Sequence, residues 1–531
     1  MEMANLLNNN TRSLNKPLSN SFYLTMIARK SALIIFTQLL NGLLGYIALK
    51  YIALYMQPWE YGVIGFAYGF VALFSVFGNL GFNAAHVKRV SEGKDLGKCV
   101  GTFAVIKTFL AGLMAGTVFL SIMVWKYIIG RGFESTTHEQ AVYVMLAYFV
   151  LLTLSQVFIS TFNARKETAK AQLPIFVYTL VRASATIFVA SYGFGVLALA
   201  YTYMLGEIFH FTLAVFFFKG YPVAKPSMEY LKSYVKFAVP MSVAAASAII
   251  MTNIDKVFIQ LFWSATQVGE YFATFNLSRF IILFSGAVSA LLFPTISSYH
   301  SNNNFREIRS LTLKAERYLS MITFPIVVIL ITLSYPVIHI LLSDKYLPAV
   351  HVLQILPLFV LLEVLSSPYT QQLSGMNLPR FTRNRILIMM VVNVFLNLFL
   401  IPQDIKSLGL RLAGLGAEGA AIATVVSYMV GLLYIRIVAW RVANTGVNWR
   451  ILIHALSASL SGLAIYWISQ HFFIARWFHL LGISLLGLAI YVSILYILRE
   501  FKKEDMDLFL DTLNIKKMLR YIKEELKGTK R

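Results

Sequence analysis

Long apolar segments, separated by short polar stretches, repeat along nearly the whole chain. Each segment reaches about 20 residues, the length that an α-helix needs to cross the hydrocarbon core of a membrane. The pattern predicts fourteen membrane-spanning helices, at 31–56, 61–83, 100–128, 140–162, 172–192, 195–218, 233–262, 268–298, 318–342, 348–373, 384–402, 416–440, 451–469 and 477–499. We therefore expect an all-α, polytopic membrane protein.

The composition agrees with a chain whose surroundings are mostly lipid. Hydrophobic residues make up 58% of the 531 positions and charged residues 13%, whereas a soluble domain carries about a quarter charged residues. Cys99 is the only cysteine, so no disulfide can form within the chain.

Lysine and arginine alternate between the predicted loops. If the N-terminus is cytoplasmic, the inner segments hold 33 of these residues and the outer segments six. Basic residues collect on the cytoplasmic side of membrane proteins. The distribution predicts a cell-membrane protein with both termini in the cytoplasm. It also accounts for most of the net charge of +22, so we expect no nucleic acid as a partner.

Short internal matches indicate a repeat of six helices. The motif YMLG at Tyr203–Gly206 recurs as YMVG at Tyr428–Gly431, late in the sixth and twelfth segments, and Gly62 and Gly269 open the second and eighth. An even number of helices gives a parallel repeat. The predicted organisation is a cytoplasmic tail at 1–30, an N-lobe of six helices at 31–219, a C-lobe of six helices at 233–441, two additional helices at 451–499, and a basic cytoplasmic tail at 500–531.

The basic tail alternates apolar and charged residues, as in DLFLDTLNIKKMLRYIKEELKG. Such a pattern is typical of an amphipathic helix that lies on the inner leaflet. Binding to a protein partner is the alternative.

Three stretches resemble one family of transporters. NIDKVFIQLFWSATQVGEYFATFNL resembles the seventh-to-eighth helix region of polysaccharide flippases, and MQPWEYGVIGFAYGFVALFSVFGNLGF the first-to-second. SGMNLPRFTRNRILIMMVVNVFLNLFLIP, followed by GLGAEGAAIATVVSYMVGLL, resembles the eleventh and twelfth. Over roughly residues 20 to 440 the chain is similar to the O-antigen and teichoic-acid type flippases of the multidrug/oligosaccharidyl-lipid/polysaccharide (MOP) superfamily.

This resemblance implies alternating access without enzymatic chemistry. The implied substrate is a lipid-linked oligosaccharide, joined through phosphate or diphosphate, which moves from the cytoplasmic to the outer leaflet during cell-surface polysaccharide biosynthesis. Expected partners are this substrate, membrane lipid and a coupling ion, either a proton or sodium. The alternatives are a multidrug exporter of the same superfamily and, less favoured, a membrane polysaccharide polymerase or glycosyltransferase.

Ionisable side chains within the apolar segments are the candidate functional residues, because a charge at the bilayer centre costs roughly 2.5–3.5 kcal/mol. The candidate cations for binding phosphate are Lys50, Lys107, Arg182, Lys256 and Arg279. The candidate anions, for ion coupling or ion pairs, are Glu207, Asp255 and Glu363. The positive excess suits a phosphate group, whereas a cationic drug would require the reverse.

Two of these anions allow more than one interpretation. Arg182 and Glu207 lie at similar distances from the turn at Gly193 and are expected to meet, either in a cavity or as a buried ion pair that only closes a helix interface. Asp255 borders a polar stripe of the seventh segment. It either orients Lys256 or another cation at a cavity wall, or latches the outer ends of segments seven and eight through a cation.

No pattern in the chain favours an enzyme, a cofactor or a metal centre. The outer loops at 129–139 and 403–415 lack closely paired carboxylates, and no Walker loop occurs. The nine histidines are scattered without metal-ligand spacing. His210 is expected to be a core residue rather than a proton relay.

Overall fold

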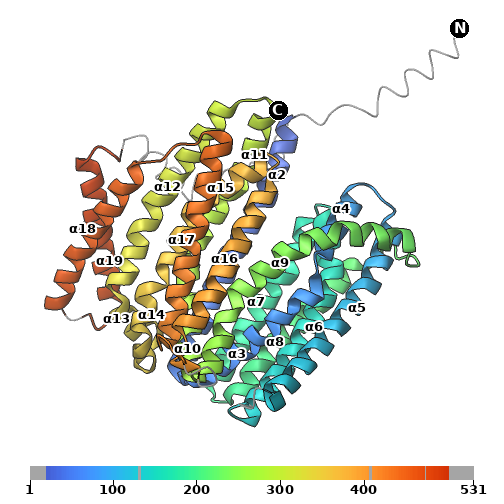
Figure 1. Cartoon of the computed structure of the whole chain (residues 1–531), viewed down its shortest axis with the longest axis horizontal. Helices are drawn as coiled ribbons and strands as arrows, with labels where there is room; N and C mark the ends of the chain where they lie inside the picture. The colour runs from blue at the N-terminus through green and yellow to red at the C-terminus, as the bar shows by residue number, and fades with distance from the viewer. Residues whose placement is uncertain (1–19, 129–132, 406–409, 473, 502–531) are drawn as a thin grey trace, which may run out of the picture.

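The structure is a computed structural model, and it describes residues 20–128, 133–405, 410–472 and 474–501 (Figure 1). The predicted amphipathic helix of the basic tail falls on 502–531 and lies outside the described residues. Most of the predicted N-terminal tail also lies outside them, although helix α2 begins at Asn20, earlier than the apolar pattern indicates.

The described chain is almost entirely helical. Its first half contains α2 (Asn20–Tyr55), α3 (Pro58–Asn79), α4 (Phe82–Ser91), α5 (Leu96–Met123), the π turn η1 (Val124–Ile128), α6 (Thr136–Ala164), α7 (Thr168–Ser191) and α8 (Gly195–Phe218). Then come α9 (Met228–Phe262), α10 (Ala265–Arg279), the 3-10 turn η2 (Phe280–Ile282), α11 (Leu283–Ser301), α12 (Phe305–Thr332), α13 (Ser334–Val337), η3 (Ile338–Leu342), η4 (Asp344–Ala349), α14 (Val350–Ile355), α15 (Pro357–Gly375) and α16 (Pro379–Leu400). Two short antiparallel strands, β1 (Asp404–Ile405) and β2 (Leu410–Arg411), precede α17 (Gly416–Ala443), α18 (Arg450–His471) and α19 (Trp477–Ile497).

Twelve helices of the described part are long and apolar enough to cross a membrane. The other two predicted segments, 31–56 and 268–298, coincide with α2 and with α10–α11, which are helical but are not among the twelve. The prediction of an all-α polytopic membrane protein is confirmed, whereas the count of fourteen spans stays a prediction.

The eighth predicted segment is broken in the middle, which the apolar pattern did not indicate. Helix α10 ends at Arg279, a 3-10 turn follows, and α11 begins at Leu283. Neither proline nor glycine stands at the break. Arg279 lies in the last turn of α10, where a positive charge is favoured by the carbonyl end of the helix. The break therefore places this guanidinium at a helix terminus rather than on a continuous helix face.

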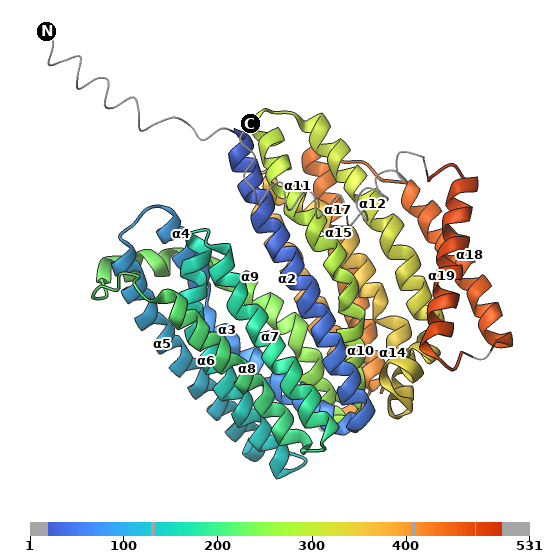
Figure 2. The ribbon, with the colours of Figure 1, turned by 180° about the vertical axis from the view of Figure 1, so that it is seen from behind.

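Helices α3–α9 and α11–α19 form two groups that separate toward the end of the molecule where the described chain begins, at α2, and ends, after α19 (Figures 1 and 2). Helix α2 packs along α7 and also contacts α11. At the opposite end the groups meet, because α10 packs against α3. The largest cluster of buried apolar residues includes side chains from both groups.

The contact between α3 and α10 depends on two glycines. A Cβ atom on Gly62 would lie 1.7 Å from the carbonyl oxygen of Ala265, and a Cβ atom on Gly269 would lie 1.9 Å from that of Pro58. These distances leave no room for any side chain, so only glycine permits this approach. The two contacts are reciprocal, as expected for two glycines that occupy corresponding positions in a repeat.

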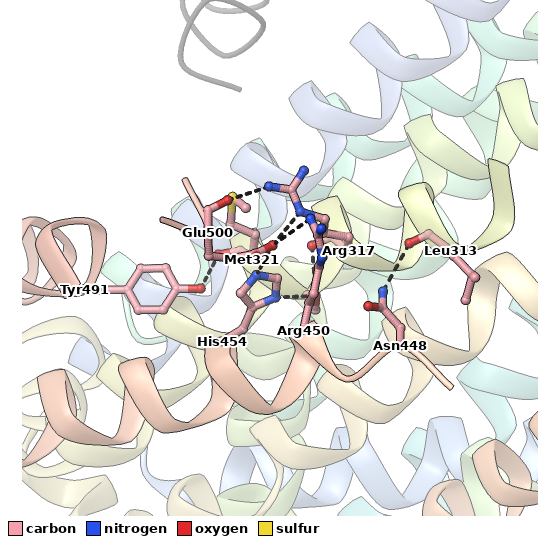
Figure 3. Close-up of polar contacts among 9 residues, drawn as sticks. Leu313, Arg317, Met321, Asn448, Arg450, His454, Tyr491 and Glu500 are labelled. Carbon is pink, nitrogen blue, oxygen red and sulfur yellow. Dashed lines mark hydrogen bonds and ion pairs between the residues drawn. The ribbon is translucent and has the colours of Figure 1, made fainter. Parts of the chain in front are cut away.

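The last two helices are fastened to α12 near the end that holds the termini. Glu500, just beyond α19, accepts a hydrogen bond of 2.6 Å from Arg317 Nε, and its backbone carbonyl accepts another of 2.6 Å from Arg317 Nη2 (Figure 3). Tyr491 OH donates to the Met321 carbonyl at 3.0 Å. These bonds join α19 to α12.

Candidate functional site

A cavity of about 270 Å³ lies among α2, α3, α7 and α10. Two arginines from different halves of the chain, Arg182 and Arg279, contribute its only charged side chains. The other lining residues are Asn41, Gly42, Gly45, Tyr46, Leu49, Tyr61, Asn276, Leu277 and Phe280. No carboxylate is among them, so the charged lining of this cavity, named here the arginine cavity, is entirely positive.

Arg182 is held in the arginine cavity by aromatic rings. Its guanidinium carbon lies 4.5 Å from the ring centre of Tyr203 and 5.7 Å from that of Tyr178. Stacking on a ring face stabilises a guanidinium without using its N–H donors. Its Nε is buried and, in the part of the chain that the structure describes, has no hydrogen-bond partner. Arg182 thus keeps donors for a ligand.

Arg279 is exposed and lies 5.5 Å from the ring centre of Phe275. No ion pair involves Arg279 among the described residues. Beside it, Asn276 Nδ2 donates to Tyr61 OH at 3.1 Å and so links α10 to α3 within the same lining. The break after α10 leaves Arg279 free to turn its planar donor fork toward an anion.

The three predicted lysines do not line the arginine cavity. Lys256 is buried, and its Nζ donates to the Thr252 carbonyl at 2.7 Å while lying 5.5 Å from the Phe275 ring centre. Lys107 is buried, and its Nζ donates to the Gly78 carbonyl at 2.7 Å. Lys50 is half-buried on α2. Lys256 and Arg279 both lie near the ring of Phe275. Of the three lysines, Lys256 is therefore the one close to an arginine of the cavity.

Asp255 is buried and is bound by neutral donors from three helices. It accepts hydrogen bonds from Tyr271 OH at 2.5 Å, Asn397 Nδ2 at 2.6 Å and Thr424 Oγ1 at 3.0 Å. Both sequence interpretations paired Asp255 with a cation, and no such ion pair occurs among the described residues. Adjacent helical residues point about 100° apart, so Asp255 faces α16 and α17 while Lys256 packs against Gly69 of α3.

Further polar atoms surround Asp255. Asn397 Nδ2 also donates to Asn393 Oδ1 at 3.1 Å, and Asn393 Nδ2 lies 3.5 Å from Thr424 Oγ1. Asn397 Oδ1 is buried and, within the described residues, accepts no hydrogen bond. These residues, Asp255, Tyr271, Asn393, Asn397 and Thr424, are named here the Asp255 network.

Glu207 does not meet Arg182, contrary to the expectation from the sequence. Its Oε1 accepts a hydrogen bond of 2.6 Å from Ser155 Oγ and lies 2.8 Å from His210 Nδ1. Arg182 lies against Tyr203 instead, one helical turn before Glu207 on α8. Helices α7 and α8 do pack together, but the carboxylate points to α6.

Glu363 is paired with an arginine at the start of the predicted segment 384–402. Its Oε2 accepts a hydrogen bond of 2.6 Å from Nη2 of Arg385, whose side chain is 5% exposed. Glu363 is half-buried, whereas another carboxylate, Glu316, is fully buried, pairs with Arg436 and accepts from Tyr369 OH at 2.8 Å. Both pairs cross between helices and neutralise their own charges.

The sequence analysis missed the neutral members of these sites. The tyrosines around Arg182 carry no charge, and aromatic residues are common throughout the chain. Asn393 and Asn397 offered a usable signal, because two asparagines four residues apart in an apolar helix lie on one face.

The fold is similar to that of two solved membrane-protein structures. A structure described as lipid II flippase MurJ in an inward closed conformation superposes with a TM-score of 0.72 at 17% identity, covering 88% of this chain and 98% of that one. An inward-facing multidrug resistance MATE family transporter gives 0.61 at 18% identity, covering 77% and 96%. The fold therefore defines the class, an all-α polytopic membrane protein with the same fold as these two structures.

The family follows from the sequence comparisons. Residues 52–351, more than half of the chain, match the polysaccharide biosynthesis protein family, and the chain belongs to it. The probable low-salt glycan biosynthesis flippase Agl15 of Haloferax volcanii is 22% identical over 405 residues, which cover 76% of this chain and 81% of that protein. The probable flippase AglR of the same organism is 26% identical over 185 residues, 34% and 36% of the two chains. The resemblance found in the sequence is confirmed.

Proposed function

We propose that the protein is a flippase that moves a lipid-linked oligosaccharide from the cytoplasmic to the outer leaflet during cell-surface polysaccharide biosynthesis. The observation that carries the proposal is the arginine cavity. Arg182 and Arg279, one from each half of the chain, line this cavity, and its described lining contains no carboxylate. A phosphate or diphosphate supplies the missing negative charge through charge-assisted hydrogen bonds. Membership of the polysaccharide biosynthesis protein family and the two named flippase relatives support the same substrate class.

The proposed cycle begins with the cavity accessible from the cytoplasm. The chain has fourteen spans in two six-helix lobes with two additional helices, and both termini are cytoplasmic. The helix groups separate toward the end that holds the termini (Figure 1), and the greater likeness to the inward-facing MATE transporter than to the outward-facing one, with TM-scores of 0.61 and 0.52, supports this state. The phosphate and the glycan enter while the lipid stays in the bilayer.

Ion coupling is assigned in the proposal to the Asp255 network. Glu363 is neutralised by Arg385 and Glu207 is bonded to Ser155 and His210, whereas Asp255 has only neutral partners. A proton would bind the carboxylate itself. A sodium ion would find oxygen donors, which hard cations prefer, in Asp255 and in the unpaired Oδ1 of Asn397.

A multidrug exporter remains the second candidate because the fold is shared with MATE transporters. A cationic drug would find no carboxylate in the described lining of the arginine cavity. The two arginines that line it favour an anion. The two candidates differ in a measurable outcome.

The test measures which lipid-linked sugars are present in cells that lack the protein. Lipid extracts of deletion and complemented cells are compared by mass spectrometry. The flippase proposal predicts that one lipid-linked oligosaccharide accumulates in the deletion strain and disappears when the wild-type gene returns. Unchanged lipid-linked sugars, together with increased sensitivity to cationic drugs, would favour the exporter.

A further inference from the structure

A second, smaller cavity of about 140 Å³ lies between the α5–α6 connection and the end of α9. Both elements lie at the end of the molecule opposite the chain termini (Figure 1). Its lining combines four aromatic rings, Phe66, Trp125, Phe133 and Trp263, with three polar side chains, Glu134, His138 and Gln260. This cavity, named here the exit pocket, is separate from the arginine cavity and shares no residue with it.

The polar side of the exit pocket has hydrogen-bonding capacity left over. Gln260 Nε2 donates to Glu134 Oε1 at 2.7 Å, which fixes the amide at the pocket wall. Gln260 Oε1 and His138 Nε2 are buried, and neither has a hydrogen-bond partner within the described residues. The Gln260 side chain lies beside the His138 ring and interacts with it, without reaching the geometry of a hydrogen bond. Unpaired buried polar atoms destabilise a protein. A hydroxyl that accepts a hydrogen bond from His138 Nε2 and donates one to Gln260 Oε1 would satisfy both atoms.

The aromatic side of the exit pocket is held in place by other contacts. Trp263 Nε1 donates to the Ile401 carbonyl at 2.7 Å, so its indole orientation is fixed. The rings of Trp125 and Phe133 stack at a centroid distance of 6.5 Å and 21°. Fixed ring faces offer a flat apolar surface. Among the described residues no lysine or arginine lines the pocket, so this lining does not suit a phosphate.

We propose that the exit pocket binds one sugar ring of the transported glycan. A pyranose has an apolar face of C–H groups and an edge of hydroxyls, which match the rings and the unpaired polar atoms, and the cavity volume suits one ring rather than a longer chain. The assignment of the exit pocket to the transported glycan, and its place in the transport cycle, rest on the proposed function. The pocket is a subsite at the releasing end and is separate from the cavity that would hold the phosphate.

The two sides of the exit pocket come from different halves of the chain. Glu134 and His138 belong to the first half, and Gln260 and Trp263 to the second. Helix α9, which carries Gln260, packs against α3 and α4 in the same helix group as α6, whereas Trp263 bonds to the Ile401 carbonyl in the other group. A bound sugar therefore stabilises the end of the molecule where the two groups meet.

The experiment is saturation-transfer NMR on the full-length protein in nanodiscs. The probes are methyl α-glucoside, methyl α-mannoside, methyl α-galactoside and N-acetylglucosamine, with glycerol as a hydroxyl control. We expect a signal from at least one sugar, none from glycerol, and a loss of about tenfold in affinity in Gln260→Ala and Glu134→Gln. Glu134 is exposed at the rim, so its variant retains the fold.

Glu139→Gln is the matched control, because Glu139 lies in the first turn of α6, close in sequence to Glu134, pairs with Lys126 and does not line the pocket. The absence of any sugar signal in the wild-type protein would overturn the proposal. An equal signal in wild type, Gln260→Ala and Glu134→Gln would overturn it as well, since the sugar would then bind elsewhere.

A separate probe reports on the arginine cavity. Thermal stabilisation by farnesyl diphosphate is measured for wild type, Arg279→Ala and Gln260→Ala. Stabilisation that is lost only in Arg279→Ala shows that the Gln260 variant is folded and keeps the phosphate site. Sugar binding without diphosphate binding would contradict the proposed function and leave the exit pocket standing, whereas the reverse result would contradict the exit pocket alone.

Discussion

At the scale of single residues, the structure separates charges that are already neutralised from charges that await a partner. Lys107 is bonded to a backbone carbonyl and Glu363 to Arg385. Arg182 and Arg279 have aromatic neighbours and no anion among the described residues. An unpaired charge in an apolar bundle is costly, so its retention at the arginine cavity is best explained by a ligand that completes it.

Asp255→Asn should uncouple transport from the ion gradient. The amide cannot take up a proton and binds a cation weakly, while its size still fits among Tyr271, Asn397 and Thr424. We expect flipping of the lipid-linked oligosaccharide to the outer leaflet to become insensitive to proton and sodium gradients. The flipping rate should also fall about tenfold.

The measurement is transport in vesicles with each gradient imposed or collapsed in turn. Glu229→Gln is the matched control, because Glu229 lies in the first turn of the same helix and is exposed. Gradient dependence that survives in Asp255→Asn would place the coupling site elsewhere.

His86 should make the protein less stable in acid. Burial, with a smaller effect of the Lys107 charge, lowers the pKa of His86 to about 3. The neutral ring is stacked on Phe103 and bonded to Tyr234 OH at 2.7 Å and Thr161 Oγ1 at 2.9 Å. The unfolded chain takes up a proton near pH 6.5 and the folded one does not, so stability is lost as the pH falls from 6.5 toward 3, by about 2 kcal/mol at pH 5.

Thermal unfolding in detergent between pH 7 and pH 5 measures this effect. His86→Gln should be less stable than wild type at pH 7, because it loses a packed ring, but its stability should change less with pH. Identical pH dependence in both proteins would mean that other groups dominate.

At the scale of elements, the α3–α10 contact is the feature most sensitive to a single methyl group. Gly62→Ala places a Cβ atom against the Ala265 carbonyl and should force the two helices apart at the end opposite the termini. We expect the outward-open state to gain population and transport to fall at least about tenfold, since close backbone approach tolerates no added carbon.

Cysteine labelling from outside, at Gln267 in a protein lacking Cys99, reports on this opening. Gly112→Ala is the matched control, because nothing lies within 4 Å of a Cβ atom at that helical position. Equal labelling in Gly62→Ala and Gly112→Ala would show that the contact does not close the outer end.

Elements with long apolar runs were predictable from the sequence. Segment 384–402, a weakly apolar stretch, is α16, and the turn at Gly193 lies between α7 and α8 with a φ of +69°. The break after Arg279 was not predictable, because neither proline nor glycine marks it. The pairing of Glu363 with Arg385 also depends on how α15 and α16 pack, which the pattern of one helix does not contain.

The site was predictable in its charges and not in its partners. Arg182 and Arg279 stand out because they interrupt apolar runs, and they do share a cavity. Asp255 stands out for the same reason, yet its neutral partners come from three other helices. Charge reveals which residues are costly, whereas only packing decides what each of them meets.

At the scale of the whole molecule, the alternating loop charges predict which end faces the cytoplasm. Thr136 and Asn302 are exposed and start or follow helices at opposite ends of the bundle. In a protein without Cys99, a cysteine at position 136 should react with an impermeant thiol reagent added outside intact cells. A cysteine at position 302 should react only after the membrane is opened, and the reverse pattern would contradict the orientation.

Transport of a lipid-linked oligosaccharide through the arginine cavity is the central claim. The direct measurement uses proteoliposomes that contain the purified protein and the lipid fraction that accumulates in deletion cells. An impermeant lectin or periodate reports how much glycan faces outward. Wild type should expose nearly all of it, Arg279→Lys should be slower because lysine lacks the planar fork, and Arg279→Ala should expose about half, as empty liposomes do.

Loss of charge-assisted hydrogen bonds of roughly 1.5–3 kcal/mol each corresponds to about 10- to 100-fold slower flipping in Arg279→Ala. Glu229→Gln should flip as fast as wild type. Full glycan exposure by a folded Arg279→Ala protein, or no exposure beyond that of empty liposomes by the wild type, would contradict the account.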